Sequence, residues 1–556
     1  MIVLTSLIFL LNSMNKFPTT SSITTNENFL NCFLNSTQKS YNNISQIIYS
    51  PTNSAFSSVL QAYIRNLRFN PTKFTNPEFI ITPVQKTHVS AAIFCSRNSG
   101  LTLKTRSGGH DFEGLSYKSD NVPFIILDMF NLREIDVDID TEIAYVESGA
   151  ILGELYYKIS ESSKVHGFPA GICPSVGIGG HISGGGYGNL LRKYGLSVDN
   201  VVDAELVDVN GRILDRKLMG EDLFWAIRGG GGASFGVVLS YTLRLVRVPE
   251  VVTCFRVERF EVDNLTDLVF KWQTVMQNVD SNLFIRLILQ PVTRNNNSDI
   301  KVVRVTFMSL FLGRVDRLMS VMNSEFPELG LLRDDCVELS WIQSVLFWSN
   351  YDYQTSTEVL LNRTYPATYL KRKSDYVMKP ISKTGLDSLW KKLAELGNPG
   401  LVFNPYGGKM SEISTSETPF PHRSGNMYKI QYSINWEKDD SDEEKKCLNM
   451  IRELYDFMTP YVSESPRSAY LNYRDIDIGV SHNFCYEEGK VYGEKYFRGN
   501  FERLVKVKSK VDGDNFFRNE QSIPTIKSSS DKLRVVYVVF FVNVIVTWFS
   551  CGRLFN

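Results

Sequence analysis

Two glycine-rich stretches, each holding one reactive side chain, constrain this chain most. The first is Arg106-Ser107-Gly108-Gly109-His110, and the second runs from Gly171 to Gly188 with Cys173 near its start. Glycine at this density is useful only where the backbone bends through positive φ or lies against a ligand. A histidine in one stretch and a cysteine in the other, both nucleophiles toward an electron-poor ring, favour a large cofactor held from two sides.

Length and composition describe an ordinary globular protein with more than one domain. A chain of 556 residues is too long for a single core, and its 43% apolar and 22% charged residues are typical values. Lys+Arg and Asp+Glu each number 60, so the formal net charge is zero. The balance argues against a nucleic-acid-binding protein, which usually shows a basic excess.

The N-terminus and the sequons indicate secretion. Residues 1–27 begin with a short apolar run that resembles the core of a signal peptide, although no basic residue precedes it. Sequons of the Asn-x-Ser/Thr type, which accept N-glycans, fit a secreted chain. These sequons lie at Asn35, Asn43, Asn264, Asn296 and Asn362.

The eight cysteines are scattered and form no CxxC pair. This excludes zinc-ribbon and thioredoxin sites, and no metal site is expected. In a secreted chain, Cys32 and Cys95 can form a disulfide that ties the N-terminal segment to the first domain, while the full connectivity stays open.

Residues 528–556 form an apolar tail. Its apolar run is shorter than the roughly 20 residues that a membrane span needs, and Asn543 interrupts it. Three interpretations stay open: a marginal anchor, a β segment, or an artefact of a gene model that runs past the natural end. The third is favoured because the sequence before the tail already has a plausible C-terminal end at Pro524.

Short strands alternate with helices in the first half of the chain, which predicts an α/β or α+β domain. The expected strands are 79–82, 101–106, 124–128, 143–147 and 235–246, and the expected helices are 87–97 and 152–162. Asn210-Gly211 predicts a hairpin between 201–208 and 211–214, because Asn-Gly supplies positive φ. Residues 251–464 show the pattern of an antiparallel sheet covered by helices.

Three glycine runs begin like the G-x-G-x-x-G dinucleotide fingerprint but end on Ile182, Asn189 and Ser234, and no P-loop Gly-Lys-Ser/Thr occurs. The run Gly232-Ala-Ser234-Phe-Gly236 matches the G-x-S-x-G of serine hydrolases, with His482 downstream. That motif needs a strand immediately before the serine. Here a glycine run precedes Ser234 and the apolar run follows it, so a hydrolase is not expected.

The two glycine stretches, together with the run from Leu190 to Asn200, resemble the berberine bridge enzyme-like family of plant FAD-linked oxidases. The resemblance covers residues 28–525, and its motifs are long and specific. It continues in Asn404-Pro-Tyr-Gly-Gly-Lys-Met410, Phe420-Pro-His-Arg423, Tyr470-Leu-Asn-Tyr-Arg-Asp475, Tyr492-Gly-Glu-Lys-Tyr-Phe497 and Asn515-Phe-Phe-Arg-Asn-Glu-Gln-Ser-Ile-Pro524.

This resemblance implies an α+β fold. The FAD-binding domain would be of the vanillyl-alcohol oxidase (PCMH) type, made of two α/β subdomains, beside a substrate domain with a helix-covered antiparallel sheet. The expected parts are a helical lead-in at 28–74, the FAD-binding domain at 75–250, the substrate domain at 251–464 and a C-terminal segment at 465–527 that returns to the FAD domain.

The resemblance also implies FAD held by two covalent bonds, from His110 to the flavin 8α-methyl and from Cys173 to ring carbon C6. Backbone N–H groups of 107–109 and 177–180 would face the FAD pyrophosphate, because oriented amides bind anions. The further residues expected at the cofactor are Arg106, Ser107, Gly108, Gly109, Val176, Gly177, Gly179, Gly180, His181, Gly184, Gly185, Tyr187 and Val238.

The implied reaction is hydride transfer from a substrate C–H to flavin N5, while a base removes the hydroxyl proton. Lys429 and Gln431 share one face of a strand, at positions where some relatives carry a carboxylate base. Tyr473 matches a base proposed in relatives, and Lys429 nearby would lower its pKa. The alternatives are an exposed lysine and a core tyrosine. Tyr187 would line the pocket beside the flavin ring. Many family members have a tyrosine where this chain has Phe112, so the aromatic ring is kept here and the tyrosine hydroxyl is absent.

Val176 holds the position that resembles the family's oxygen gate, where a small side chain accompanies oxidase behaviour. We therefore expect O₂ as acceptor and H₂O₂ as product. Oxidation of a mono- or oligosaccharide at the anomeric carbon is the favoured reaction, followed by oxidation of a monolignol and by alkaloid ring closure. A non-catalytic secreted flavoprotein is the alternative from another class. We expect a monomer in the cell wall or apoplast, with no nucleic-acid or membrane partner.

Overall fold

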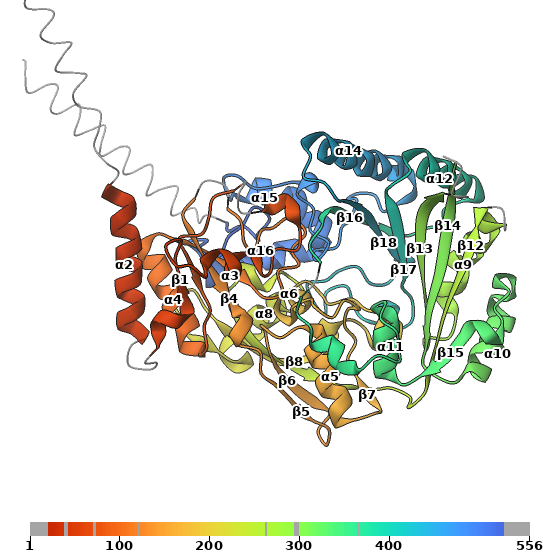
Figure 1. The fold of residues 1–556 in the computed structure, drawn as a ribbon, viewed down its shortest axis with the longest axis horizontal. Helices are drawn as coiled ribbons and strands as arrows, with labels where there is room; N and C mark the ends of the chain where they lie inside the picture. The colour runs from red at the N-terminus through yellow and green to blue at the C-terminus, as the bar shows by residue number, and fades with distance from the viewer. Residues whose placement is uncertain are drawn as a thin grey trace, which may run out of the picture.

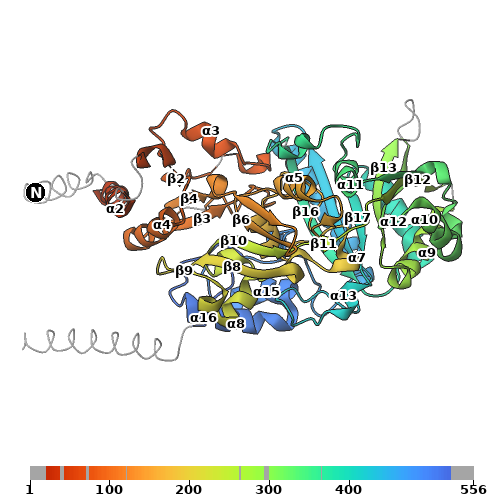
Figure 2. The ribbon, with the colours of Figure 1, turned by 90° about the horizontal axis from the view of Figure 1, so that it is seen from below.

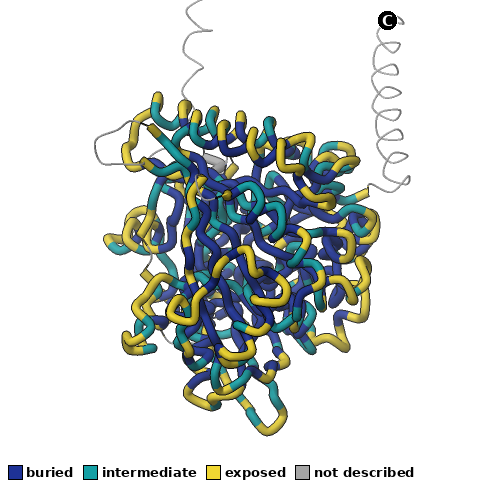
Figure 3. Tube along the Cα trace, turned by 90° about the vertical axis from the view of Figure 1, so that its right-hand side faces the viewer, coloured by how far each residue is buried: buried dark blue, intermediate teal, exposed yellow. Residues whose placement is uncertain are grey.

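The computed structural model describes residues 20–37, 43–70, 74–119, 122–261, 264–293, 300–364 and 366–526. Most of the signal-like N-terminus, the sequon at Asn296 and the apolar tail at 528–556 lie outside these residues. Figures 1 and 2 show two lobes, with the N-terminal and C-terminal parts of the chain together in one lobe and the residues between them in the other. Figure 3 shows buried backbone in the interior of the molecule and exposed backbone mainly at its periphery.

The first layer of the N-terminal lobe is a four-stranded sheet in which the two strands beside β4 run parallel to it. Its strand β4 is buried at every position, as expected for a parallel strand covered on both faces. Helix α4 (Lys86–Ser99) packs beside helix α2 (Thr20–Thr37), and a disulfide between Cys32 and Cys95 joins them, which confirms the expected pairing. The strands, in sheet order, are β1 (Ile48–Tyr49), β2 (Phe79–Ile81), β4 (Phe124–Asp128) and β3 (Thr102–Arg106).

The second layer is a five-stranded antiparallel sheet. The predicted hairpin is present between β8 and β9, and Gly211 in its turn has φ of 76°. The predicted helix at 152–162 is α5 (Leu152–Ser162), which buries Leu155 and Ile159. The strands, in sheet order, are β5 (Ile135–Asp138), β6 (Ile143–Glu147), β10 (Val237–Arg244), β8 (Val201–Val207) and β9 (Ile213–Leu214).

The second lobe is built on a seven-stranded sheet in which every pairing is antiparallel. Helices cover one face, and the other faces the first lobe (Figure 1), so the expected α+β class is confirmed. The covering helices are α9 (Leu265–Asn278), α10 (Val315–Glu325), α12 (Lys383–Leu396) and α14 (Ser441–Phe457). The strands, in sheet order, are β15 (Cys336–Leu339), β12 (Val252–Phe260), β14 (Lys301–Phe311), β13 (Leu283–Thr293), β17 (Gly400–Pro405), β18 (Tyr428–Trp436) and β16 (Tyr369–Val377).

The C-terminal segment returns to the first lobe, where α15 (Tyr486–Phe497) and α16 (Phe501–Val511) lie beside α8 (Arg216–Ile227). Ser234, the serine of the hydrolase-like motif, accepts the N–H of Ile523 on its hydroxyl at 3.2 Å, and strand β10 follows it instead of preceding it. Within the described residues, no helix combines the length and apolar character that a membrane crossing requires.

Candidate active site

The two glycine stretches touch backbone to backbone. A Cβ at Gly108 would lie 2.4 Å from the Gly177 nitrogen, and a Cβ at Gly177 would lie 2.1 Å from Ser107 Oγ. Ser107 donates its hydroxyl to the Ser148 carbonyl at 2.7 Å and so fixes the first stretch at the end of β3. Glycine is therefore required because any side chain at either position would separate the two stretches.

His110 and Cys173 converge on one hydroxyl. Ser175 Oγ lies 3.0 Å from His110 Nε2 and 3.6 Å from Cys173 Sγ. Burial, with a contribution from Arg65, lowers the pKa of His110 to about 3, so this imidazole is neutral and keeps a lone pair. Burial raises the pKa of the Cys173 thiol, against the opposing effect of Ser175. Sequence reasoning missed Ser175, whose only signal was its place between Cys173 and Gly177.

The surroundings of the two side chains fit a large cofactor. Gly180 is exposed, and a Cβ there would meet open space. Two of the amides expected at the pyrophosphate are used inside the protein, because Ile178 N–H donates to the Ala150 carbonyl and Gly179 N–H donates to the Ser148 carbonyl. The expectation is therefore wrong for these two amides, and the amides of Gly177, Gly180 and residues 107–109 remain the candidates.

Several residues expected at the cofactor hold the loops in place. Arg106 donates to Asp128 at 2.7 Å and to the carbonyls of Leu60 and Val59, each at 2.8 Å, so its guanidinium anchors the first stretch. His181 accepts the Gly171 N–H on Nε2 at 3.1 Å. A Cβ at Gly184 would lie 2.0 Å from Asn472 Oδ1, a Cβ at Gly185 would lie 3.0 Å from the Phe420 ring, and Val238 is buried.

Tyr187 of the first lobe forms a polar triad with Asn404 and Arg286 of the second lobe. Its hydroxyl donates to Asn404 Oδ1 and accepts from Arg286 Nη2, and Arg286 Nε donates to Asn404 Oδ1 at 2.7 Å. Burial raises the pKa of Tyr187, although Arg286 opposes this. The hydroxyl is therefore neutral at ordinary pH. Asn404 was visible only as part of a family motif, and Arg286 on β13 had no sequence signal.

Lys429 on β18 lies in a cage of three tyrosine rings. Its Nζ is 3.5, 4.0 and 4.2 Å from the ring centroids of Tyr187, Tyr470 and Tyr473. The side chain is fully buried, and Nζ has no hydrogen-bond partner among the described residues. Burial, helped by Arg286, lowers the pKa of Lys429 well below 10.5. The alternative of an exposed lysine is therefore wrong, and burial shifts this amine toward its neutral form.

The expected effect of Lys429 on Tyr473 is also wrong. Burial raises the pKa of Tyr473 well above 10, and the neighbouring Tyr187 raises it further. The physical reason is that a lysine which is itself neutral supplies no cation to stabilise a phenolate. The Tyr473 hydroxyl is consequently protonated at neutral pH.

The remaining expected site residues lie around this cage. The rings of Phe112 and Tyr473 are 6.0 Å apart between centroids. Gln431 is half-buried on β18, two residues from Lys429 and on the same strand face. Val176 is half-buried, and its carbonyl accepts the N–H of Leu152 at 2.9 Å. Within the described ranges, no cluster of His, Cys, Asp and Glu has the arrangement of a metal site.

Comparisons with known proteins agree with this geometry. Residues 77–216 match the FAD binding domain family, and residues 469–524 match the berberine and berberine-like family. Berberine bridge enzyme-like 21 of Arabidopsis thaliana is 57% identical over 509 residues, which cover 91% of this chain and 94% of that protein.

Solved structures show the same likeness. The structure of berberine bridge enzyme-like protein 28 from Arabidopsis thaliana superposes with a TM-score of 0.84 at 44% identity, and covers 90% of this chain and 100% of that one. Phl p 4, a grass pollen allergen with glucose dehydrogenase activity, superposes with a TM-score of 0.85 at 41% identity and the same coverage. A Phl p 4 variant in which one isoleucine is replaced by valine is a glucose oxidase. The chain therefore belongs to the berberine bridge enzyme-like family of FAD-linked oxidases.

Proposed function

We propose that this protein is a secreted oxidase that binds FAD covalently through His110 and Cys173 and oxidises the anomeric carbon of a mono- or oligosaccharide. The observation that carries the proposal is the convergence of both side chains on Ser175, where the two glycine-rich stretches pack backbone to backbone. When bound, FAD supplies a two-electron acceptor, and molecular oxygen then takes the electrons to give hydrogen peroxide.

The covalent anchors are tested by acid precipitation. The neutral His110 imidazole has the lone pair that a covalent bond needs, and Ser175 holds it beside the Cys173 thiol. We expect the precipitated wild-type protein to retain all its flavin. His110→Ala and Cys173→Ala should each retain it through the other anchor, and the double variant should release it. Release of all flavin from the wild-type protein would overturn the anchor assignment.

We assign the acceptance of the substrate hydroxyl proton to Tyr473 and Lys429. The Tyr473 hydroxyl is protonated, so it can accept the substrate proton only if a neighbouring group removes the proton that the hydroxyl already carries. Lys429 Nζ lies 4.2 Å from the Tyr473 ring centroid and has no hydrogen-bond partner among the described residues, so we propose that it takes this proton and becomes an ammonium once bound substrate brings it into contact with the hydroxyl. The Tyr187 ring, whose hydroxyl Asn404 and Arg286 hold by hydrogen bonds, lies 3.5 Å from the amine at its centroid.

The substrate class is supported by the glucose activity of Phl p 4 and by the mixture of rings and amides at this site. A peroxide-coupled assay with simple sugars, cello-oligosaccharides, galacturonides and monolignols tests it. We expect peroxide with at least one sugar. Peroxide with monolignols alone would replace the substrate class, and no peroxide with any alcohol would favour a flavoprotein without turnover.

Val176 is proposed as the residue that admits oxygen. The Phl p 4 variant in which valine replaces isoleucine is an oxidase, and we propose that Val176 holds the equivalent position. Val176→Ile should slow reoxidation of the reduced enzyme by O₂ and leave reduction by the sugar within about threefold, because the gate is remote from proton transfer. Anaerobic and aerobic stopped-flow separates the two steps, and equal slowing of both would contradict the assignment.

Secretion is supported by the Cys32–Cys95 disulfide and by the four described sequon asparagines, all of which are exposed. Expression in plant cells, followed by removal of N-glycans and mass measurement of the extracellular protein, tests this. A protein that stays inside the cell without glycans would contradict the proposed location.

A further inference from the structure

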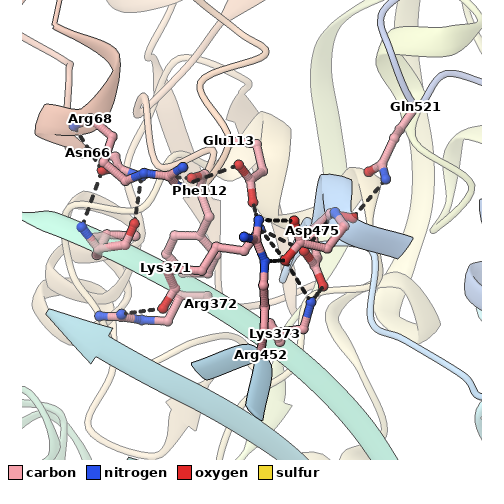
Figure 4. A network of polar contacts seen from close by, with 12 residues as sticks. Asn66, Arg68, Phe112, Glu113, Lys371, Arg372, Lys373, Arg452, Asp475 and Gln521 are labelled. Carbon is pink, nitrogen blue, oxygen red and sulfur yellow. Dashed lines mark hydrogen bonds and ion pairs between the residues drawn. The ribbon is translucent and has the colours of Figure 1, made fainter. Parts of the chain in front are cut away.

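Three short segments meet at the edge strand β16 (Figure 4). Each holds an aromatic residue, or a residue that contacts an aromatic ring, next to charged residues. Asp111-Phe112-Glu113 follows His110, Lys371-Arg372-Lys373 lies in β16, and Tyr473-Arg474-Asp475 belongs to the C-terminal segment. The Phe112 and Tyr473 rings are tilted by 46° at 6.0 Å, and the Arg372 guanidinium lies 5.8 Å from the Phe112 ring. Residues far apart in the sequence therefore meet beside Tyr473 of the candidate active site.

The first ionic link joins all three segments. Lys371 Nζ donates to Glu113 Oε1 and to Asp475 Oδ1, the latter at 2.7 Å, and the exposed fractions of these side chains are 1%, 0% and 2%. Lys373 Nζ donates to the second carboxylate oxygen of Asp475 at 2.6 Å. Burial opposes the charge on Lys371, but Asp475 and Glu113 outweigh it and raise the Lys371 pKa. The lysine is therefore a fixed cation.

The link continues outward as a balanced network. Asp477 accepts from Lys373 at 3.1 Å and from Arg452 of α14 at 2.8 Å. Arg68 lies 3.8 Å from Glu113 and 2.9 Å from Glu444. Each buried charge thus has an opposite charge beside it, which holds the three segments in a single register.

A second ionic link joins the two ring-bearing segments directly. Arg474 Nε lies 3.2 Å from Asp111 Oδ2, and Asp111 Oδ1 accepts the N–H of Glu113 at 2.9 Å. Asp111 directly precedes Phe112, and Arg474 directly follows Tyr473. Phe112 is therefore flanked in sequence by two carboxylates that are each tied to the segment carrying Tyr473.

We propose that Asp111, Glu113, Lys371, Arg474 and Asp475 are positioning residues, which form a clamp of two ionic links that sets the separation of the Phe112 and Tyr473 rings. The inference rests on the proposed function, which gives the Tyr473 hydroxyl a part in proton transfer and so makes the position of its ring matter. One link fixes the distance between the two segments, and the second link prevents rotation about the first. Apolar packing alone would let the segments slide, because it has no preferred direction.

Paired neutralisations test the clamp without leaving a buried charge alone. Glu113→Gln/Lys371→Met removes the first link, and Asp111→Asn/Arg474→Gln removes the second at half-buried positions that tolerate change better. The matched control is Asp375→Asn/Arg467→Gln. That pair also joins β16 to the C-terminal segment, at 2.6 Å, and Asp375 is fully buried, but neither residue flanks the rings.

Crystal structures of the flavin-loaded variants give the readout that is independent of turnover. We expect either clamp variant to move the rings away from the 6.0 Å separation, whereas the control keeps it. In steady-state kinetics with the sugar, kcat/KM should fall about tenfold or more, chiefly through KM, because small displacements of positioning groups cost large factors in rate. The control should stay within about twofold at a comparable loss of melting temperature.

Rings that keep their separation in both clamp variants would overturn the inference, and so would a control that moves the rings and lowers kcat/KM equally. If the first double variant does not fold, the second decides alone. A wild-type enzyme without peroxide release on any alcohol would defeat the proposed function, while the ring separation in the crystals would still decide the role of the clamp.

Discussion

Lys371 and Lys429 lie on neighbouring strands of one sheet, β16 and β18, and both are buried, yet their surroundings give them opposite chemistry. Carboxylates of Glu113 and Asp475 contact Lys371 and raise its pKa, so it is a permanent cation. Tyrosine rings surround Lys429, and burial lowers its pKa well below 10.5. The difference teaches that burial alone does not define the role of a lysine, because the partner decides whether it stabilises the fold or exchanges protons.

The largest expected effect is the loss of turnover in the Lys429→Met variant. Methionine has nearly the same volume, so the cage stays filled while the proton acceptor is lost. We expect kcat/KM to fall by roughly 10²–10⁴-fold, the range of general-base contributions, with no loss of melting temperature. Steady-state peroxide release and calorimetry measure both. A variant that keeps its activity within threefold would place Lys429 outside the reaction.

The second largest expected effect is the loss of folding stability in the Lys371→Met variant. This change leaves Glu113 as a buried charge whose nearest remaining cation is Arg68 at 3.8 Å, while Asp475 keeps Lys373, and the loss of one partner from a buried pair typically costs about 3–5 kcal/mol. Glu113→Gln/Lys371→Met should cost less than Lys371→Met alone, because it removes the charge that would be left unpaired. Chemical denaturation of the flavin-loaded proteins gives the free energy of unfolding of each. If Lys371→Met is as stable as the wild type, the proposed structural role of Lys371, and with it the difference from Lys429, is wrong.

A smaller effect is the pH dependence of stability. The folded-state pKa of Lys429 lies below its unfolded value, so between the two values the unfolded chain binds one more proton and stability rises with pH. The stability of Lys429→Met should therefore increase relative to that of the wild type as pH falls below 10.5 toward the folded-state pKa, by up to about 1.4 kcal/mol per pH unit. For Lys371 the raised pKa keeps its stabilisation intact below pH 10.5 and loses it only at higher pH. Parallel curves for wild type and Lys429→Met would contradict a neutral amine.

The smallest effect is expected at a solvent-exposed pair. Lys445 and Asp442 on α14 are 3.4 Å apart, with 73% and 91% of their side chains exposed. Water screens both charges, so Lys445→Ala should leave the melting temperature and kcat/KM unchanged. Thermal scans of this variant beside Lys371→Met measure how much of the difference comes from burial, and a clear loss at Lys445 would weaken that explanation.

Much of the fold was readable because its signals are local. The turn at Asn210-Gly211, the helix at 152–162 and the glycine contacts of Gly108 depend on backbone freedom and on periodicity within a few residues. The antiparallel character of residues 251–464 followed from strand patterns alone. By contrast, Ser175 gave no signal of its double contact with His110 and Cys173, since that contact needs two loops folded against each other.

The sequence by itself determined the glycine stretches, the two reactive side chains and the family to which they belong. Only the tertiary structure decided that Lys429 is neutral, that Tyr473 stays protonated and that Glu113 meets Lys371 across 258 residues of chain. The physical reason is that a missing Cβ acts on its own backbone, whereas a pKa depends on lost water and nearby charges, which distant segments supply together.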